Sequence, residues 1–242
     1  MLSPATMNVA HLFLPGIAAL FLLQVTDPVA DFRRARELAS AGDLQGAAAL
    51  LEQSIGGFPG WGLPHVELAE VLMRAGGEEA RQGRALAEAR RLELQNPRAW
   101  ALSALWFERQ GETQAAIQAC ERALALREEL TDTRIQLGLL LVQTERHAQA
   151  IPHLERALRE RPEERGVRAN LADAYERTGD LEGAEKHLRE LVRAAPGNAL
   201  YARRLARFYE RAGRAAEAAA VLREAGDTMP ERRMRPLPDS AR

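Results

Sequence analysis

PEERGVRANLADAYERTGDLEGAEKHLRELVRAAPGN, residues Pro162–Asn198, contains two short amphipathic segments with a glycine between them. In the first segment Leu171 and Tyr175 stand one helical turn apart, so their side chains fall on the same helical face. Gly179 supplies the turn, and Pro196 ends the second segment because proline lacks the N–H that a helix interior requires. The stretch therefore predicts a helical hairpin.

This hairpin recurs along most of the chain, and such a period indicates a repeat architecture. A turn glycine returns every 34 or 35 residues, with Glu145 in the one remaining turn position: Gly42, Gly76, Gly111, Gly179 and Gly213. Seven residues before each turn stands a small residue: Ala35, Ala69, Ala104, Gly138, Ala172 and Ala206. Four residues before it stands a large one: Leu38, Leu72, Phe107, Leu141, Tyr175 and Tyr209. Small residues let two helices approach closely, and large ones fill the space beside them.

These columns resemble the tetratricopeptide repeat (TPR) family over residues 28–230. The resemblance implies an all-α fold, a right-handed superhelical solenoid of six helix-turn-helix repeats with a concave, peptide-binding face. The expected repeats are residues 28–61, 62–96, 97–130, 131–164, 165–198 and 199–230. Repeat two is the least regular, because Gly83 falls inside its second helix and Arg81 replaces the usual alanine. We expect one continuous array in which each hairpin contacts its neighbours.

Residues 1–27 differ from the repeats. The run Val9–Val25, VAHLFLPGIAALFLLQV, carries no charged residue, and the first basic residue is Arg33. As a helix, 17 residues would span about 25 Å, slightly less than the hydrocarbon core of a bilayer. Three interpretations stay open: a cleaved signal peptide, a retained N-terminal membrane anchor, or an internal buried helix. The first lacks a positively charged start and has Pro28 near the possible cleavage position. We expect an exported, periplasmic or membrane-anchored protein rather than a cytoplasmic one.

Composition excludes several classes of function. Of 242 residues, 28% are charged and the formal net charge is −1, so the basic excess typical of nucleic-acid binders is missing. The single cysteine, Cys120, excludes an intramolecular disulfide and is expected to be a buried small residue. Outside the repeats only about 27 residues precede the array and 12 follow it, which is too few for a catalytic domain.

Motifs for catalysis, cofactors and metals are also missing. The chain has neither His-Glu-Xaa-Xaa-His nor Gly-Xaa-Ser-Xaa-Gly, and the loop Gly56–Gly62 lacks the Gly-Lys-Ser/Thr ending of a phosphate loop. His153 and His187 stand one repeat apart, too far to share a metal, and we expect solvated surface histidines. The sequence therefore predicts a protein that is no enzyme and has no catalytic residue, no cofactor and no metal.

The concave groove is the candidate site. In the family the first helix of each repeat lines it, which implies these groove residues: Ala101, Leu105, Ile135, Leu139, Asp173, Glu176, Arg203 and Arg207. The order is apolar, then acidic, then basic, so we expect a peptide with apolar side chains and an acidic end toward repeat six. Chaperone-binding members hold a terminal carboxylate with basic and amide side chains, of which only Asn170 and Arg204 are matched here. That kind of ligand is therefore not expected.

The C-terminal end carries two further predictions. The last helix, Ala215–Gly226, exposes mainly alanine and valine where a capping helix would usually follow, so self-association or docking through it is possible. Residues 231–242 contain Pro236 and Pro238 and are expected to be disordered.

The sequence thus favours a non-catalytic scaffold or adaptor that mediates protein–protein interaction through its groove in the bacterial cell envelope, similar to envelope TPR proteins. It contacts the membrane only through the N-terminal segment. The alternative is a regulatory subunit of a cytoplasmic enzyme complex that is tethered to the membrane. The partner's identity is not encoded in any recognisable motif.

Overall fold

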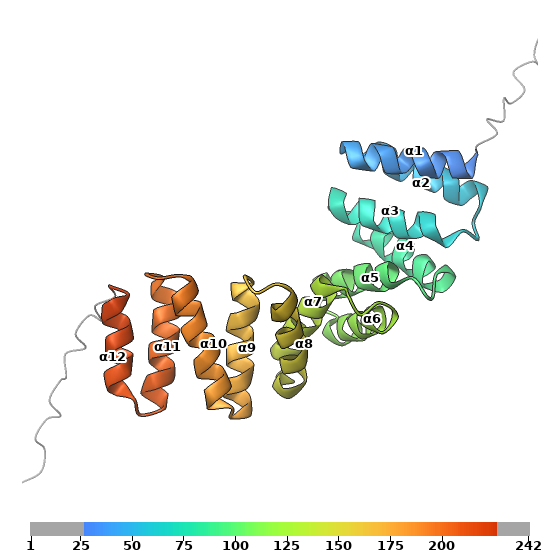
Figure 1. The fold of residues 1–242 in the computed structure, drawn as a ribbon. Helices are drawn as coiled ribbons and strands as arrows, with labels where there is room; N and C mark the ends of the chain where they lie inside the picture. The colour runs from blue at the N-terminus through green and yellow to red at the C-terminus, as the bar shows by residue number, and fades with distance from the viewer. Residues whose placement is uncertain (1–26, 227–242) are drawn as a thin grey trace, which may run out of the picture. The chain divides into compact units, whose positions relative to one another are not determined.

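The computed structural model describes residues 27–226, and that part of the chain consists of α-helices joined by short turns, with no strand. The predicted segment 1–27, apart from Asp27, and the predicted tail 231–242 lie outside the described residues. The helices are α1 Pro28–Ala41, α2 Leu44–Gly57, α3 Gly62–Ala75, α4 Glu79–Leu92, α5 Pro97–Arg109, α6 Thr113–Leu126, α7 Thr131–Gln143, α8 His147–Glu160, α9 Arg165–Thr178, α10 Leu181–Ala194, α11 Ala199–Arg211 and α12 Ala215–Glu224. The prediction of an all-α fold of helix pairs is confirmed (Figure 1).

The described residues form two compact units, where the sequence analysis expected one continuous array. Unit 1 ends at Glu93 and contains α1–α4, and unit 2 begins at Leu94 and contains α5–α12. Within each unit consecutive helices lie side by side. The division falls at the end of repeat two, whose helix α4 contains Gly83 and the exposed charged residues Arg84 and Arg91.

The turns between paired helices follow the predicted glycine column. Each turn glycine has a positive φ, from 75° to 90°: Gly42, Gly76, Gly111, Gly179 and Gly213. Glu145 fills the sixth position with a φ of 59°, a conformation that costs a residue with a side chain free energy. Side-chain caps add to two of the turns, where Asp43 and Asp180 accept hydrogen bonds from the first-turn amides of α2 and α10.

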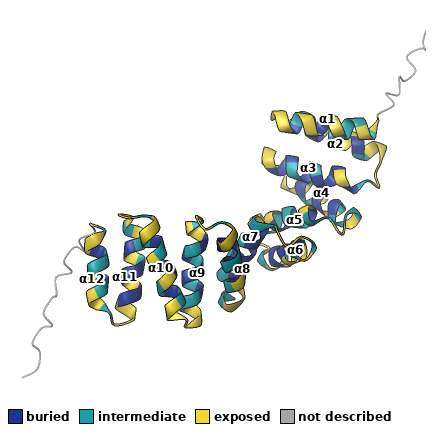
Figure 2. Ribbon diagram, in the orientation of Figure 1, coloured by how far each residue is buried: buried dark blue, intermediate teal, exposed yellow. Residues whose placement is uncertain are grey.

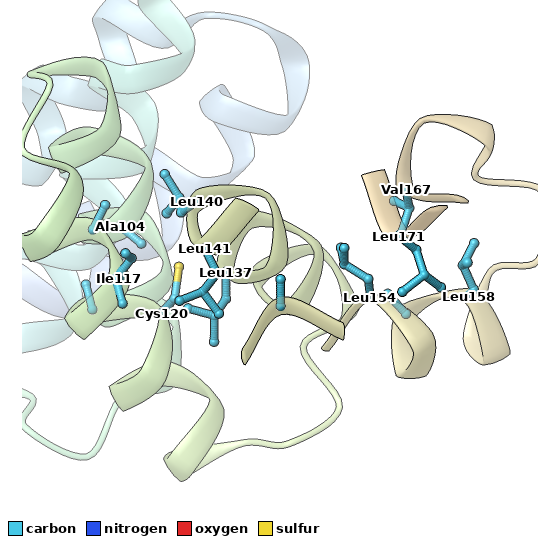
Figure 3. Close-up of a cluster of buried hydrophobic side chains, with 14 residues drawn as sticks. Ala104, Ile117, Cys120, Leu137, Leu140, Leu141, Leu154, Leu158, Val167 and Leu171 are labelled. Carbon is cyan, nitrogen blue, oxygen red and sulfur yellow. The ribbon is translucent and has the colours of Figure 1, made fainter. Parts of the chain in front are cut away.

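The core lies between the paired helices. Alanines of the small-residue column are 0–2% exposed, and Figure 2 shows the buried positions on the sides where helices meet. In unit 2 one cluster joins α5–α9, and Figure 3 shows Ile117, Cys120 and Leu137 gathered in one part of it and Leu154, Leu158 and Leu171 in another. A second cluster joins α9–α12, and Tyr175 packs against both. The expectation that Cys120 is buried is met, since its side chain is 0% exposed.

Among residues 27–226, no helix combines the length and the apolar character needed to cross a membrane.

Candidate functional site

All eight predicted groove residues lie on the odd-numbered helices of unit 2, and these helices are neighbours. Gln136 Nε2 on α7 donates to Glu108 Oε2 on α5 at 2.7 Å. Helices α7 and α9 pack together, and Arg204 Nη2 on α11 donates to the carbonyl of Ala169 on α9 at 2.9 Å. The predicted residues therefore lie on one row of adjacent helices, which we call the odd-helix row: α5, α7, α9 and α11.

The first half of this row is apolar and partly open to solvent. Leu105 on α5 is 41% exposed. On α7, Ile135, Leu139 and Val142 recur at helical spacing and lie half-buried against the core cluster. Ala101 is also half-buried. A set of partly buried apolar side chains beside an exposed leucine can take up further apolar surface from a ligand.

The second half of the row is charged, and its acidic residues are already paired. Asp173 Oδ1 lies 3.8 Å from Arg204 Nη2, and Glu176 Oε1 lies 2.7 Å from Arg211 Nη2, both across the α9–α11 interface. The acidic part of the predicted groove is therefore compensated by arginines of the next helix. Arg203 and Arg207 are exposed.

Sequence reasoning missed the pairing residues Arg204 and Arg211, although a signal for them existed. They stand seven residues apart, which is two helical turns, so they share a face of α11. Asp173 and Glu176 stand three apart on α9 and share a face in the same way. Placing the two helices side by side in the repeat register would have set these faces opposite each other.

The two positions that matched a carboxylate clamp are engaged within the chain. Asn170 Nδ2 donates to the carbonyl of Gly166 on its own helix at 2.8 Å. Arg204 donates to Ala169 and lies beside Asp173. The expectation that the row does not hold a free C-terminal carboxylate in that manner stays a prediction.

Tyrosine hydroxyls connect α9 and α11 to the even-numbered helices before them. Tyr175 on α9 donates to Glu155 Oε1 on α8 at 2.5 Å, and Tyr209 on α11 donates to Glu185 Oε1 on α10 at 3.1 Å. Burial, together with the neighbouring carboxylate, raises the pKa of Tyr175 above its usual value. These bonds help to set the orientation of α9 and α11.

The histidines are less solvated than the sequence analysis expected. His65 and His187 are buried and His153 is half-buried, and burial lowers the pKa of all three below the usual value. His187 is covered because its ring stacks on Tyr175, with ring centroids 5.7 Å apart. Within residues 27–226, no group of three or more His, Cys, Asp or Glu residues is placed to hold a metal ion.

Helix α12, where self-association was considered, buries Leu222 and packs Val221 against the second core cluster. The exposed large apolar side chains found in residues 27–226 do not include any from this helix. Docking through the last helix stays a prediction.

Comparison with known families agrees with this geometry. Three tetratricopeptide repeat family models match residues 99–134, 141–203 and 183–228. No curated protein matches the sequence significantly.

Solved structures share the fold. YrrB, described as a TPR protein with an unusual peptide-binding site, is 21% identical with a TM-score of 0.68, over 75% of this chain and 93% of that chain. MamA from Desulfovibrio magneticus RS-1 is 20% identical with a TM-score of 0.60, over 69% and 93%. PilF from Pseudomonas aeruginosa is 19% identical with a TM-score of 0.60, over 80% and 88%. The repeated helix pairs, their turn glycines and these matches together show that the chain belongs to the tetratricopeptide repeat family.

Proposed function

We propose that the protein is a non-catalytic scaffold that binds a peptide segment of a partner protein on the odd-helix row. Tetratricopeptide repeats are in general protein-interaction modules without catalytic activity, and YrrB is described as having a peptide-binding site. The observation that carries the proposal is the apolar half of the row, where Leu105 is 41% exposed beside the half-buried Ile135 and Leu139. Burying these side chains against a ligand would remove apolar area from water.

The ligand that fits this row has apolar side chains at one end and acidic ones at the other. Arg207 is exposed on α11, so its guanidinium can attract a carboxylate. Asp173 and Glu176 are compensated by Arg204 and Arg211, so they oppose an acidic segment less than unpaired carboxylates would. The acidic end therefore lies toward α11.

The binding experiment uses the full chain and peptides selected on it from a random library. Leu105→Glu should weaken binding about tenfold or more, because a leucine buried by the ligand contributes about 1.5–3 kcal/mol. Leu181→Glu is the matched control, since Leu181 is 51% exposed on α10 outside the row. Equal affinity of both variants and the unmutated chain would refute binding on this row.

The direction of the ligand is tested by salt. Arg207→Glu should weaken binding at low salt and have little effect at high salt, because screening removes the attraction of exposed charges. The exposed Arg223 on α12 provides the control variant Arg223→Glu. An Arg207 variant that binds like the control at low salt would overturn the direction while leaving the apolar contacts in place.

For the site of action, we propose the bacterial cell envelope, with residues 9–25 retained as a membrane anchor. The presence of Pro28 near the possible cleavage position supports retention. The alternative, a tethered subunit of a cytoplasmic enzyme complex, has support from Arg33, Arg34 and Arg36, which lie shortly after the apolar run. Protease treatment of intact cells, with the outer membrane permeabilised where one is present, separates the two: digestion of the repeats supports the envelope, and protection supports the cytoplasmic side.

A further inference from the structure

Aromatic and aliphatic side chains gather at the first turn of α1, where they are exposed or half-buried. Val29 is 49% exposed and Phe58, in the α2–α3 loop, is 57% exposed. The ring of Trp61 joins them, with its centroid 4.7 Å from that of Phe32 and 6.5 Å from that of Phe58. We call Val29, Phe32, Phe58 and Trp61 the aromatic patch.

The fold holds this patch together by fixing the end of α2 against the start of α1. The Ser54 hydroxyl donates to the carbonyl of Pro28 at 2.6 Å, and the Ser54 side chain is buried. A Cβ at Gly57 would lie 2.5 Å from Cγ of Pro28, so glycine allows the close approach. The α2–α3 loop therefore lies beside the first turn of α1, as Figure 1 also shows.

The aromatic patch lies close in sequence to the uncharged run of residues 9–25. Val25, the last residue of the uncharged run, precedes Pro28 by three residues. A chain extends at most about 3.6 Å per residue, so Pro28 lies within about 11 Å of Val25. If residues 9–25 are held in a bilayer, which is part of the proposed function, the first turn of α1 must lie at the bilayer surface.

The rest of α1 has no exposed apolar surface against which residues 9–25 could pack as a further helix. Its solvent-facing side carries Arg33, Arg34 and Glu37, all exposed, whereas an additional packed helix would need apolar partners there. Residues 27–41 contain three acidic and three basic side chains, so their charges balance and give no preference for anionic lipid. Trp61, which is half-buried beside the exposed Phe58, is of a residue type that is enriched at the headgroup level of a membrane.

We propose that the aromatic patch is a membrane-contact surface, which inserts between lipid headgroups and holds unit 1 with the first turn of α1 toward the bilayer. The partner is a lipid surface, and a zwitterionic one is sufficient. The patch contributes orientation, while residues 9–25 contribute the attachment.

The test places a fluorophore beside the patch in the full chain, reconstituted in phosphatidylcholine vesicles. Gly60→Cys is the reporter, because Gly60 is exposed and a Cβ there meets no atom within 4 Å. Cys120 stays unlabelled in the folded chain because it is buried and burial raises the pKa of its thiol to about 12. Gln45→Cys is the control, exposed at the opposite end of α2 and about 20 Å from the α2–α3 loop at 1.5 Å per residue.

Lipids with a nitroxide on the headgroup should quench the fluorophore at position 60 and not the one at position 45. The substitution Phe58→Asp should abolish the quenching at position 60, while the chain should still float with the vesicles. Floated chain without quenching at 60, or with equal quenching at 45, refutes the surface and leaves the anchor standing. A blue-shifted label at 60 without vesicles would mean that protein covers the patch, which also refutes it. A chain that does not float refutes the anchor and, with it, the surface.

Discussion

Mild acidification should destabilise the folded chain, because three histidines are held neutral in poorly solvated positions. His187 is 9% exposed, its Nδ1 has no hydrogen-bond partner, and its ring stacks on Tyr175. Burial lowers its pKa; Glu190 opposes this, while Arg168 and Lys186 add to it. Burial also lowers the pKa of His65 and of His153.

The sign follows from linkage. Each folded-state pKa lies below the unfolded value of about 6.5, so below that pH the unfolded chain binds more protons and the free energy of unfolding falls. Above about pH 6.5 the contribution is fully present. One histidine can change the free energy of unfolding by at most about 1.4 kcal/mol per pH unit, so the three together set a ceiling of about 4 kcal/mol per unit. Arg214 holds the carboxyl pKa of Glu185 below its ordinary value of 4.5. The stabilisation that this carboxylate contributes is therefore lost at a lower pH than the contribution of the histidines.

Urea denaturation of the full chain at pH 7.5 and pH 5.5 measures the effect. His187→Phe keeps a ring on Tyr175 and removes the titration, so it should reduce the difference in stability between the two pH values. Adding His65→Phe and His153→Phe should remove most of what remains. The reasoning is wrong if the triple variant keeps the full pH dependence, or if the unmutated chain becomes more stable between pH 7.5 and 5.5.

Three further substitutions or reactions test the packing. Gly138→Ala should lower the free energy of unfolding by about 1–2 kcal/mol despite the better helix propensity of alanine, because its Cβ would lie 2.4 Å from Cδ2 of the buried Leu154; unchanged stability in urea would contradict this. Glu145→Gly should raise stability by about 0.5–1 kcal/mol by relieving the left-handed backbone, and a lower denaturation midpoint would count against it. The thiol of Cys120 should react with an aromatic disulfide only as fast as the chain unfolds, and rapid reaction of the native protein would disprove its burial.

The helices and turns could be predicted because their signals are local in sequence. The fixed spacing of small and large residues sets where two helices approach, and the turn column extends even to Glu145, whose positive φ could be inferred from its position alone. The prediction that His187 is solvated was wrong, because the ring of Tyr175 on the previous helix covers the His187 ring. That contact depends on side-chain rotamers, which the repeat period does not determine.

The candidate site shows the same division between local and non-local information. Repeat register placed Leu105, Ile135 and Leu139 on the odd-helix row, where they are exposed or half-buried. It did not identify which arginines face α9, because Arg203 and Arg204 are adjacent in sequence and point to different sides of the helix. Choosing between them requires the orientation of α11, which the Tyr209–Glu185 hydrogen bond helps to fix.

The pairing across α9 and α11 also bears on how the row can recognise charge. The Asp173 and Arg204 side chains are each 37% exposed, and an ion pair of this kind contributes only about 0–1 kcal/mol. A ligand carboxylate could therefore replace Asp173 as the partner of Arg204 at little cost, but it would leave Asp173 uncompensated beside it. The exposed Arg207 imposes no such penalty. A ligand carboxylate therefore gains more binding free energy at Arg207 than at Arg204. Replacing Arg207 should accordingly reduce the preference of the row for an acidic end more than replacing Arg204.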